Sequence, residues 1–198
     1  REHLLKSFRF VFFLSFPMMF GLMAISCNLV PWFFGSGYDK VVPNMMVISP
    51  ILVIIALSNI MGTQYLLPIG RQKEYTLSVV VGCVVNFSMN LLLIPHLLSI
   101  GAAIATVIAE SSVTGVQIYC IRKDFDFRHI VKENMHYIIS AFFMFILTYF
   151  LARLLQPSII STFLCVVVGA SMYFGILTMM KDDMLLQVRT MLEAKFIK

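Results

Sequence analysis

Six long apolar runs constrain this chain more than any other feature. They cover residues 10–30, 47–67, 76–94, 100–121, 137–155 and 159–180, and each is 19 to 22 residues long. A helix needs about 20 largely apolar residues to cross a bilayer. A crossing segment must satisfy its own backbone hydrogen bonds, and none of the runs alternates like a barrel strand. The sequence therefore predicts an all-α, polytopic membrane helix bundle with six transmembrane helices.

The composition excludes several other classes of protein. Hydrophobic residues make up 60% of the chain and charged residues 13%, against roughly 45–50% and about 25% in soluble domains. This excludes a disordered chain, a nucleic-acid-binding tail and a disulfide-stapled module. The cysteines lack CxxC spacing and are expected to act as small hydrophobic residues; they are Cys27, Cys83, Cys120 and Cys165.

Lysine and arginine are distributed unevenly between the connecting segments. Alternate segments, beginning with the N-terminal one, contain 13 of the 15 cations, and the others contain only Lys40 and Arg153. Cytoplasmic loops of membrane proteins carry such an excess. We therefore expect a multi-pass membrane protein, with both ends of this segment in the cytoplasm. The net charge of +5 is then explained by the orientation of the chain in the membrane, and we expect no nucleic-acid partner.

Three further local patterns are informative. Residues 124–136 are expected to form a cytoplasmic loop, and Pro17 and Pro50 are expected to kink their helices. Residues 181–198 carry apolar side chains at helical spacing after Asp182, which predicts a short amphipathic helix on the membrane surface. A simple stop-transfer anchor is the alternative for this tail.

Because the chain begins without Met or a signal-peptide pattern, we expect a piece of a longer protein.

The motifs of enzymes and of metal sites are missing. The chain has no HExxH, Walker A or GxSxG sequence, and its four histidines share no metal-ligand spacing. An enzyme needs a convergent set of reactive groups. The sequence therefore predicts a non-enzyme without a cofactor or metal.

Glu110 is the one charged residue deep inside an apolar run. Thr106, Thr114 and Gln117 lie at helical spacing from it, which predicts a polar stripe along the span 100–121. A second stripe of small residues (Gly101, Ala105, Ala109 and Ser112) would let another helix approach closely. An intramembrane carboxylate usually faces a bundle interior or a water-filled cavity. Either Glu110 lines such a cavity, or it is protonated and held by an interhelical hydrogen bond.

Amide side chains add to this polar pattern. Asn86 and Asn90 are one turn apart on one face of the span 76–94, and Asn59 lies within the span 47–67. Interhelical hydrogen bonding is the simplest role for each of them. Together they predict a polar path across the membrane, which a transporter needs and a pure anchor does not. The candidate cavity-lining residues are Glu110, Asn86, Asn90, Thr106, Thr114, Gln117 and Asn59.

Four motifs resemble a known family, and they occur in that family's order between about residues 10 and 123. The segment 33–38 resembles an external turn of prokaryotic polysaccharide flippases, and 68–73 resembles their "leucine, small, glycine, basic, x, lysine" pattern. Residues 86–95 are similar to their "N-x3-N-x-x-L-I-P" ending, and 100–110 to their "GAAxATxxAE" helix. The chain thus resembles the multidrug, oligosaccharidyl-lipid and polysaccharide exporter superfamily.

The resemblance implies an architecture and a function. These exporters have two lobes of six helices around a central cavity, often followed by two more helices. On that scheme, residues 1–123 resemble the last four helices of the second lobe, and 137–180 resemble the extra pair. The implied substrate is an undecaprenyl-pyrophosphate-linked oligosaccharide, flipped by alternating access for surface polysaccharide synthesis. The implied partners are membrane lipid, this substrate and a missing N-terminal lobe.

Three alternatives remain open at the level of sequence. An ion-coupled multidrug antiporter of the same superfamily would use an intramembrane carboxylate such as Glu110. A lipid II flippase would have a more cationic cavity. A non-transporting membrane scaffold would need no polar path.

Overall fold

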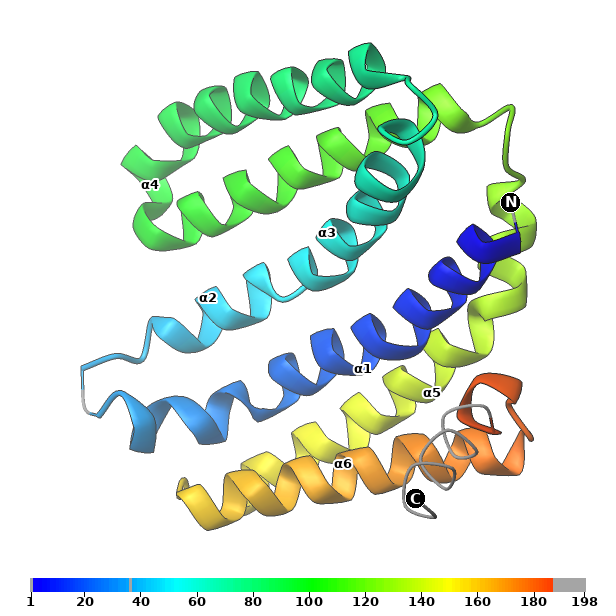
Figure 1. The fold of residues 1–198 in the computed structure, drawn as a ribbon. Helices are drawn as coiled ribbons and strands as arrows, with labels where there is room; N and C mark the ends of the chain where they lie inside the picture. The colour runs from blue at the N-terminus through cyan, green and yellow to red at the C-terminus, as the bar shows by residue number, and fades with distance from the viewer. Residues whose placement is uncertain (1, 36, 187–198) are drawn as a thin grey trace, which may run out of the picture.

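The structure, a computed structural model, describes residues 2–35 and 37–186, and every regular element within them is a helix (Figure 1). The predicted all-α class is confirmed for this part of the chain. The elements in order are α1 (Glu2–Phe33), α2 (Val41–Ile48), α3 (Ile51–Asn59), the π-helical segment η1 (Ile60–Leu66), α4 (Gln72–Ile121), α5 (Phe127–Leu154) and α6 (Ile159–Met179).

Five helical stretches are long and apolar enough to cross a membrane, so the described chain is that of a multi-pass membrane protein. The sequence predicted six. The difference lies in α4, which contains both predicted spans 76–94 and 100–121. Leu98 interrupts it with a φ of 52° and a ψ of −127°, and the two arms run back alongside each other (Figure 1).

Tight packing at Gly101 explains how α4 can reverse without an extended loop. A Cβ atom at Gly101 would lie 2.5 Å from the carbonyl oxygen of Leu93, so only glycine allows the second arm to start this close to the first. Pro95, which lacks a backbone N–H, precedes the reversal. The predicted connection around residues 95–99 is therefore a compact turn.

Other boundaries also differ from the expectation. The helix breaks at Pro50, between α2 and α3, where a kink was predicted. By contrast, α1 continues through Pro17 without a break. α5 already begins at Phe127, so most of the segment predicted as a loop, 124–136, is helical. The Asp126 carboxylate caps this helix by accepting from the backbone N–H groups of Arg128 and His129.

The tail is described only at its beginning. The carboxylate of Asp182 accepts a hydrogen bond of 3.0 Å from the backbone N–H of Leu185, a contact that caps the start of a helix. The greater part of the predicted amphipathic helix, residues 187–198, lies outside the described residues. That prediction is therefore neither confirmed nor contradicted.

The helices pack in two groups that share α1. α5 and α6 pack against α1 and against each other, whereas α4 packs against α2, α3 and η1 (Figure 1). The principal apolar cluster joins the groups at one end of the bundle, where Phe8 of α1 meets Phe125 edge to face and Tyr65 of η1 also contacts Phe125. Away from this end, α4 and the α5–α6 pair lie on opposite sides of α1 (Figure 1).

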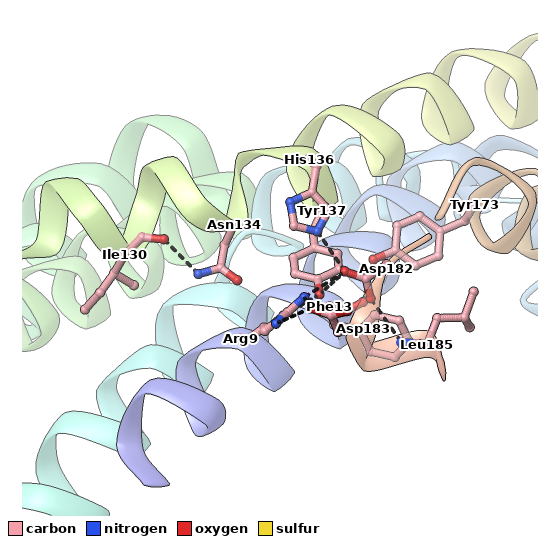
Figure 2. Close-up of polar contacts among 10 residues, drawn as sticks. All are labelled: Arg9, Phe13, Ile130, Asn134, His136, Tyr137, Tyr173, Asp182, Asp183 and Leu185. Carbon is pink, nitrogen blue, oxygen red and sulfur yellow. Dashed lines mark hydrogen bonds and ion pairs between the residues drawn. The ribbon is translucent and has the colours of Figure 1, made fainter. Parts of the chain in front are cut away.

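Polar side chains near both ends of α1 bond to the neighbouring α5 and α6 region. Near the start of α1, Arg9 forms an ion pair of 3.2 Å with the buried Asp182, which also accepts a hydrogen bond from Tyr137 and contacts His136 (Figure 2). Near the far end, the amide of Asn28 donates to the carbonyl oxygens of Ala152 and Leu155. These bonds make α1, α5 and α6 one packed unit.

Candidate functional site

Five of the seven candidate residues line one pocket between α3 and the two arms of α4. The pocket has a volume of about 560 Å³, within the range of roughly 300–1,000 Å³ that is typical of small-molecule sites. The five are Asn59 from α3, Asn86 and Asn90 from the first arm, and Glu110 and Gln117 from the second. Helical spacing predicted which of these residues share a face of their helix, and in the fold these faces line the same pocket.

A close approach of the two arms forms the base of this pocket. Gly82 of the first arm is buried, and a Cβ atom there would lie 2.3 Å from the Cγ2 atom of Val113 on the second arm. Ala109, next to this contact, is 4% exposed, and Ala105 is fully buried. The predicted small-residue stripe therefore does let another helix approach, and that helix is the preceding arm of α4.

The amides of the pocket form few bonds between helices. Asn90 donates to the side-chain oxygen of Asn86 at 3.0 Å and to its backbone oxygen at 2.8 Å, one turn away on the same arm. Gln117 donates to Ser78 on the facing arm at 3.2 Å. Interhelical bonding, the simplest role that the sequence suggested, is thus found for Gln117 alone among the pocket amides.

Unused hydrogen-bonding capacity remains in the pocket. The side-chain oxygen of Gln117 is buried without a partner, and buried polar atoms are normally paired. Within residues 2–35 and 37–186, no group hydrogen-bonds to the half-buried Glu110 carboxylate. Both roles predicted for Glu110, as a cavity-lining residue and as a glutamic acid held by another helix, therefore stay predictions.

Two candidate residues lie outside this pocket. Thr114 is 7% exposed and donates to the carbonyl oxygen of Ile54 at 3.3 Å, so it holds α4 against α3. Thr106 donates to Ala102 within its own arm and borders a smaller cavity beside Asn44 and Ser99, which bond to each other at 2.9 Å. Neither threonine lines the pocket between α3 and the two arms of α4.

Sequence reasoning missed two residues of the pocket that carry usable chemistry. Tyr75 and Cys83 line it together with Asn86 and Asn90, and all four follow one face of the first arm at spacings of three, four or eight residues. That spacing was available in the sequence. Cys83 was interpreted as a small hydrophobic residue, but its side chain is exposed in the pocket.

The remaining polar clusters are structural in character. The guanidinium of Arg71 binds the carboxylate of Asp124 at 2.6 Å and the carbonyl oxygen of Cys120 at 2.8 Å, which fixes the start of α4 to its end. No group of three or more His, Cys, Asp or Glu residues in the described part of the chain is arranged to hold a metal ion. The pocket between α3 and α4 is therefore the candidate functional site.

Comparison with known proteins gives two sequence relatives, and the chain matches no family model. It is 31% identical to a putative O-antigen transporter of Escherichia coli K12 over 90 residues, which cover 46% of this chain and 22% of that protein. It is 30% identical to an uncharacterised membrane protein of Methanocaldococcus jannaschii over 143 residues, which cover 72% of this chain and 27% of that protein. The chain thus spans about a quarter of the length of these relatives.

A solved structure shares the fold. The lipid II flippase MurJ in an inward closed conformation superposes with a TM-score of 0.79 over 93% of this chain and 40% of that one, at 16% sequence identity. The named sequence relative is thus a putative transporter and the structural neighbour a flippase, in agreement with the prediction of a non-enzyme. In sequence and in fold, the chain resembles the flippases of the multidrug, oligosaccharidyl-lipid and polysaccharide exporter superfamily, as its motifs predicted.

Proposed function

We propose that this chain is the C-terminal part of a flippase that moves undecaprenyl-pyrophosphate-linked oligosaccharides across the bacterial cytoplasmic membrane. The observation that carries the proposal is the polar pocket between α3 and α4, which lies in a fold shared with a lipid II flippase. A flippase must take a hydrophilic headgroup through the bilayer while the lipid tail stays in it. Polar residues in spanning helices mark such pathways.

The proposal includes six crossings and a fixed orientation. The two arms of α4 cross the membrane separately, with the reversal at Leu98 on the outer side. The 13-to-2 division of lysine and arginine between alternate connections supports both ends of this segment being cytoplasmic. Residues 182–186, which follow α6, would then lie at the cytoplasmic surface.

The proposed partner of this segment is the remainder of the same protein. The relatives are about four times as long as the matched regions, and a lobe of helices before this chain would supply the opposite wall of the cavity. Alternating access then consists of a rocking motion between that lobe and this one. Membrane lipid and the lipid-linked oligosaccharide are the other partners.

The O-antigen type of substrate is preferred to lipid II. Sequence identity to the putative O-antigen transporter is 31%, whereas identity to the lipid II flippase is 16%, a level that supports the fold alone.

The test is complementation with the full-length protein. It should restore surface polysaccharide in a strain that lacks its own oligosaccharide flippase, and it should clear lipid-linked repeat units from the inner leaflet. A version with Asn86 and Asn90 both replaced by leucine should lose this activity while reaching the membrane in normal amount. Full activity of that double variant, or rescue only of a strain depleted of lipid II flippase, would contradict the proposal.

A further inference from the structure

The pocket between α3 and α4 presents polar side chains among apolar ones but contains no lysine or arginine. Its lining comes from two segments, 41–70 and 74–121, and neither contains a lysine or an arginine. The charged group in the pocket is the carboxylate of Glu110. Any ligand of this pocket must therefore tolerate a carboxylate without a compensating positive charge from these helices.

A pyrophosphate group does not meet this condition. Two like charges about 4 Å apart repel by roughly 1 kcal/mol in water and by several kcal/mol in the lower effective dielectric of a protein. Phosphate sites in proteins instead use arginine, lysine or clustered backbone N–H groups. The helices that line this pocket keep their backbone N–H groups in their own hydrogen bonds.

A sugar does meet the condition. Each amide both donates and accepts hydrogen bonds, and a carboxylate accepts from hydroxyl groups. Asn59 forms no hydrogen bond to another side chain within the described residues, the Gln117 side-chain oxygen is buried without a partner, and Glu110 accepts no hydrogen bond. Tyr75 adds an aromatic side chain to the same lining, and its hydroxyl can also donate and accept.

We infer that this pocket binds the saccharide part of the lipid-linked headgroup by its hydroxyl groups and excludes the pyrophosphate. The inference rests on the proposed flippase function and narrows it. The pyrophosphate is held by cationic groups outside this pocket, so the glycan reaches farther into the lobe formed by α2, α3 and α4. Recognition of the sugar and recognition of the lipid phosphate are separate in space.

Cys83 provides a reporter inside the pocket. Its side chain is exposed and lines the pocket, whereas Cys27 and Cys120 are half-buried and Cys165 is buried. In the full-length protein, with the other cysteines replaced by alanine, the rate at which a water-soluble maleimide labels Cys83 measures access to the pocket. A matched control carries Cys83→Ser together with Thr106→Cys, because Thr106 lies on the same helix but outside this pocket.

Three probes separate the sugar from the phosphate. They are inorganic pyrophosphate, undecaprenyl pyrophosphate without sugar, and the glycan-bearing lipid extracted from cells depleted of the flippase. We expect only the glycan-bearing lipid to slow the labelling of Cys83, by about tenfold when the site is nearly saturated, and the Thr106→Cys control to be labelled at an unchanged rate. Native mass spectrometry of the same samples reports which lipids bind anywhere on the protein.

The outcomes distinguish this inference from the proposed function. If both lipids bind and both protect Cys83, or if inorganic pyrophosphate protects it, the pocket takes the phosphate and the inference is wrong. If the glycan-bearing lipid binds but leaves Cys83 unprotected, the sugar lies elsewhere, although the flippase proposal survives. If neither lipid binds, the flippase proposal itself fails.

A substitution in the pocket gives an independent check. Asn90→Leu preserves size but removes an amide that both donates and accepts, and it should weaken protection of Cys83 by the glycan-bearing lipid about tenfold, which corresponds to the loss of one or two net hydrogen bonds. Thr106→Val should leave protection unchanged. Equal affinity for the undecaprenyl pyrophosphate without sugar is expected in both variants. A loss of affinity for that lipid in Asn90→Leu would contradict the division between sugar and phosphate.

Discussion

Glu110 is the residue at which the rival functions differ most clearly. Its carboxylate lines the pocket and accepts no hydrogen bond within the described chain. If it serves as an acceptor for sugar hydroxyls, glutamine can replace it, because a carboxamide oxygen accepts as well. We expect Glu110→Gln to keep transport within about threefold of the wild type and Glu110→Leu to lose about tenfold, the value of a hydrogen bond to a charged group.

Export of surface polysaccharide per unit of membrane protein is the measurement for both variants, taken over a range of pH. An ion-coupled antiporter needs a group that exchanges a proton or cation. In that case Glu110→Gln would be as inactive as Glu110→Leu, and the pH dependence of transport would vanish. Such a result would favour the antiporter over the flippase.

Gly82 is a second residue with a defined consequence. A Cβ atom there would meet the Cγ2 atom of Val113 at 2.3 Å, whereas a Cβ atom at Gly115 on the same helix would meet nothing within 4 Å. Gly82→Ala should therefore destabilise the fold, because overpacking costs about 1–3 kcal/mol and the gain in helix propensity is at most about 1 kcal/mol. Gly115→Ala should be neutral or slightly stabilising.

Thermal unfolding of the purified protein in detergent checks this pair of glycine variants. The double variant Gly82→Ala, Val113→Ala removes the clashing methyl groups and should recover much of the lost stability. If Gly82→Ala unfolds at the wild-type temperature, the two arms of α4 do not approach each other as closely as the structure places them.

The candidate residues also illustrate what the sequence could predict. Helical spacing assigned Asn86 and Asn90 to one face and Glu110 and Gln117 to another, and the fold brings these faces together. Spacing could not predict that Thr114 binds Ile54 and that Thr106 borders a different cavity. Successive turns of α4 pack against different elements, because the helical stretch that faces α4 is broken at Pro50 and continues from α3 into η1.

At the scale of elements, hydropathy predicted the location of the helices correctly but not the residues at which they begin. Helix α1 starts eight residues and α5 ten residues before the predicted apolar runs. Hydropathy measures the part of a helix that contacts lipid, and a helix that continues into water leaves no such signal. Polar contacts support these extensions, including the capping of α5 by Asp126 and the bonds of Arg9 on α1.

The contact between Arg9 and Asp182 predicts how pH affects the packing of α1, α5 and α6 (Figure 2). Burial alone would raise the pKa of Asp182, but hydrogen bonds from Tyr137, the Leu185 N–H, His136 and Arg9 outweigh it, so the pKa lies below its ordinary value. A carboxyl group with a lowered pKa stabilises the fold above its unfolded pKa of about 4, and the stabilisation is lost as the pH falls through the lowered value.

Asp182→Asn should therefore unfold at a lower temperature than the wild type. The difference between the two unfolding temperatures should persist from pH 7 to pH 5 and should decrease below about pH 4. Asp183→Asn is a suitable control, because Asp183 lies next to Asp182 but its side chain is 71% exposed and its two contacts with Arg9, at 3.4 and 3.5 Å, are long. Exposed ion pairs contribute at most about 1 kcal/mol. If both variants unfold alike, the buried network does not hold α6 against α1.

At the scale of the whole molecule, the open question is how often this chain crosses the membrane. The described chain has five helical stretches of sufficient length, and the longest of them, α4, folds back at Leu98. A continuous 50-residue helix would be about 75 Å long, far longer than the roughly 30 Å of the hydrocarbon core. The reversal brings each arm close to the length of a single crossing, and this is the physical argument for six crossings.

Cysteine labelling from the two sides of the membrane tests this topology. With native cysteines replaced, a cysteine at Lys73 and one at Lys123 should both react only from the cytoplasmic side, and one at Ser99, next to the reversal, only from the outside. Lys73 lies in the first turn of α4 and Lys123 just beyond its last residue, so a single crossing of α4 would place them on opposite sides of the membrane. Two crossings place them on the same side, and the concentration of cations in these two connections favours the cytoplasm as that side. Labelling of Lys73→Cys and Lys123→Cys from opposite sides would overturn the six-helix arrangement and, with it, the pocket between the two arms as part of a pathway through the bilayer.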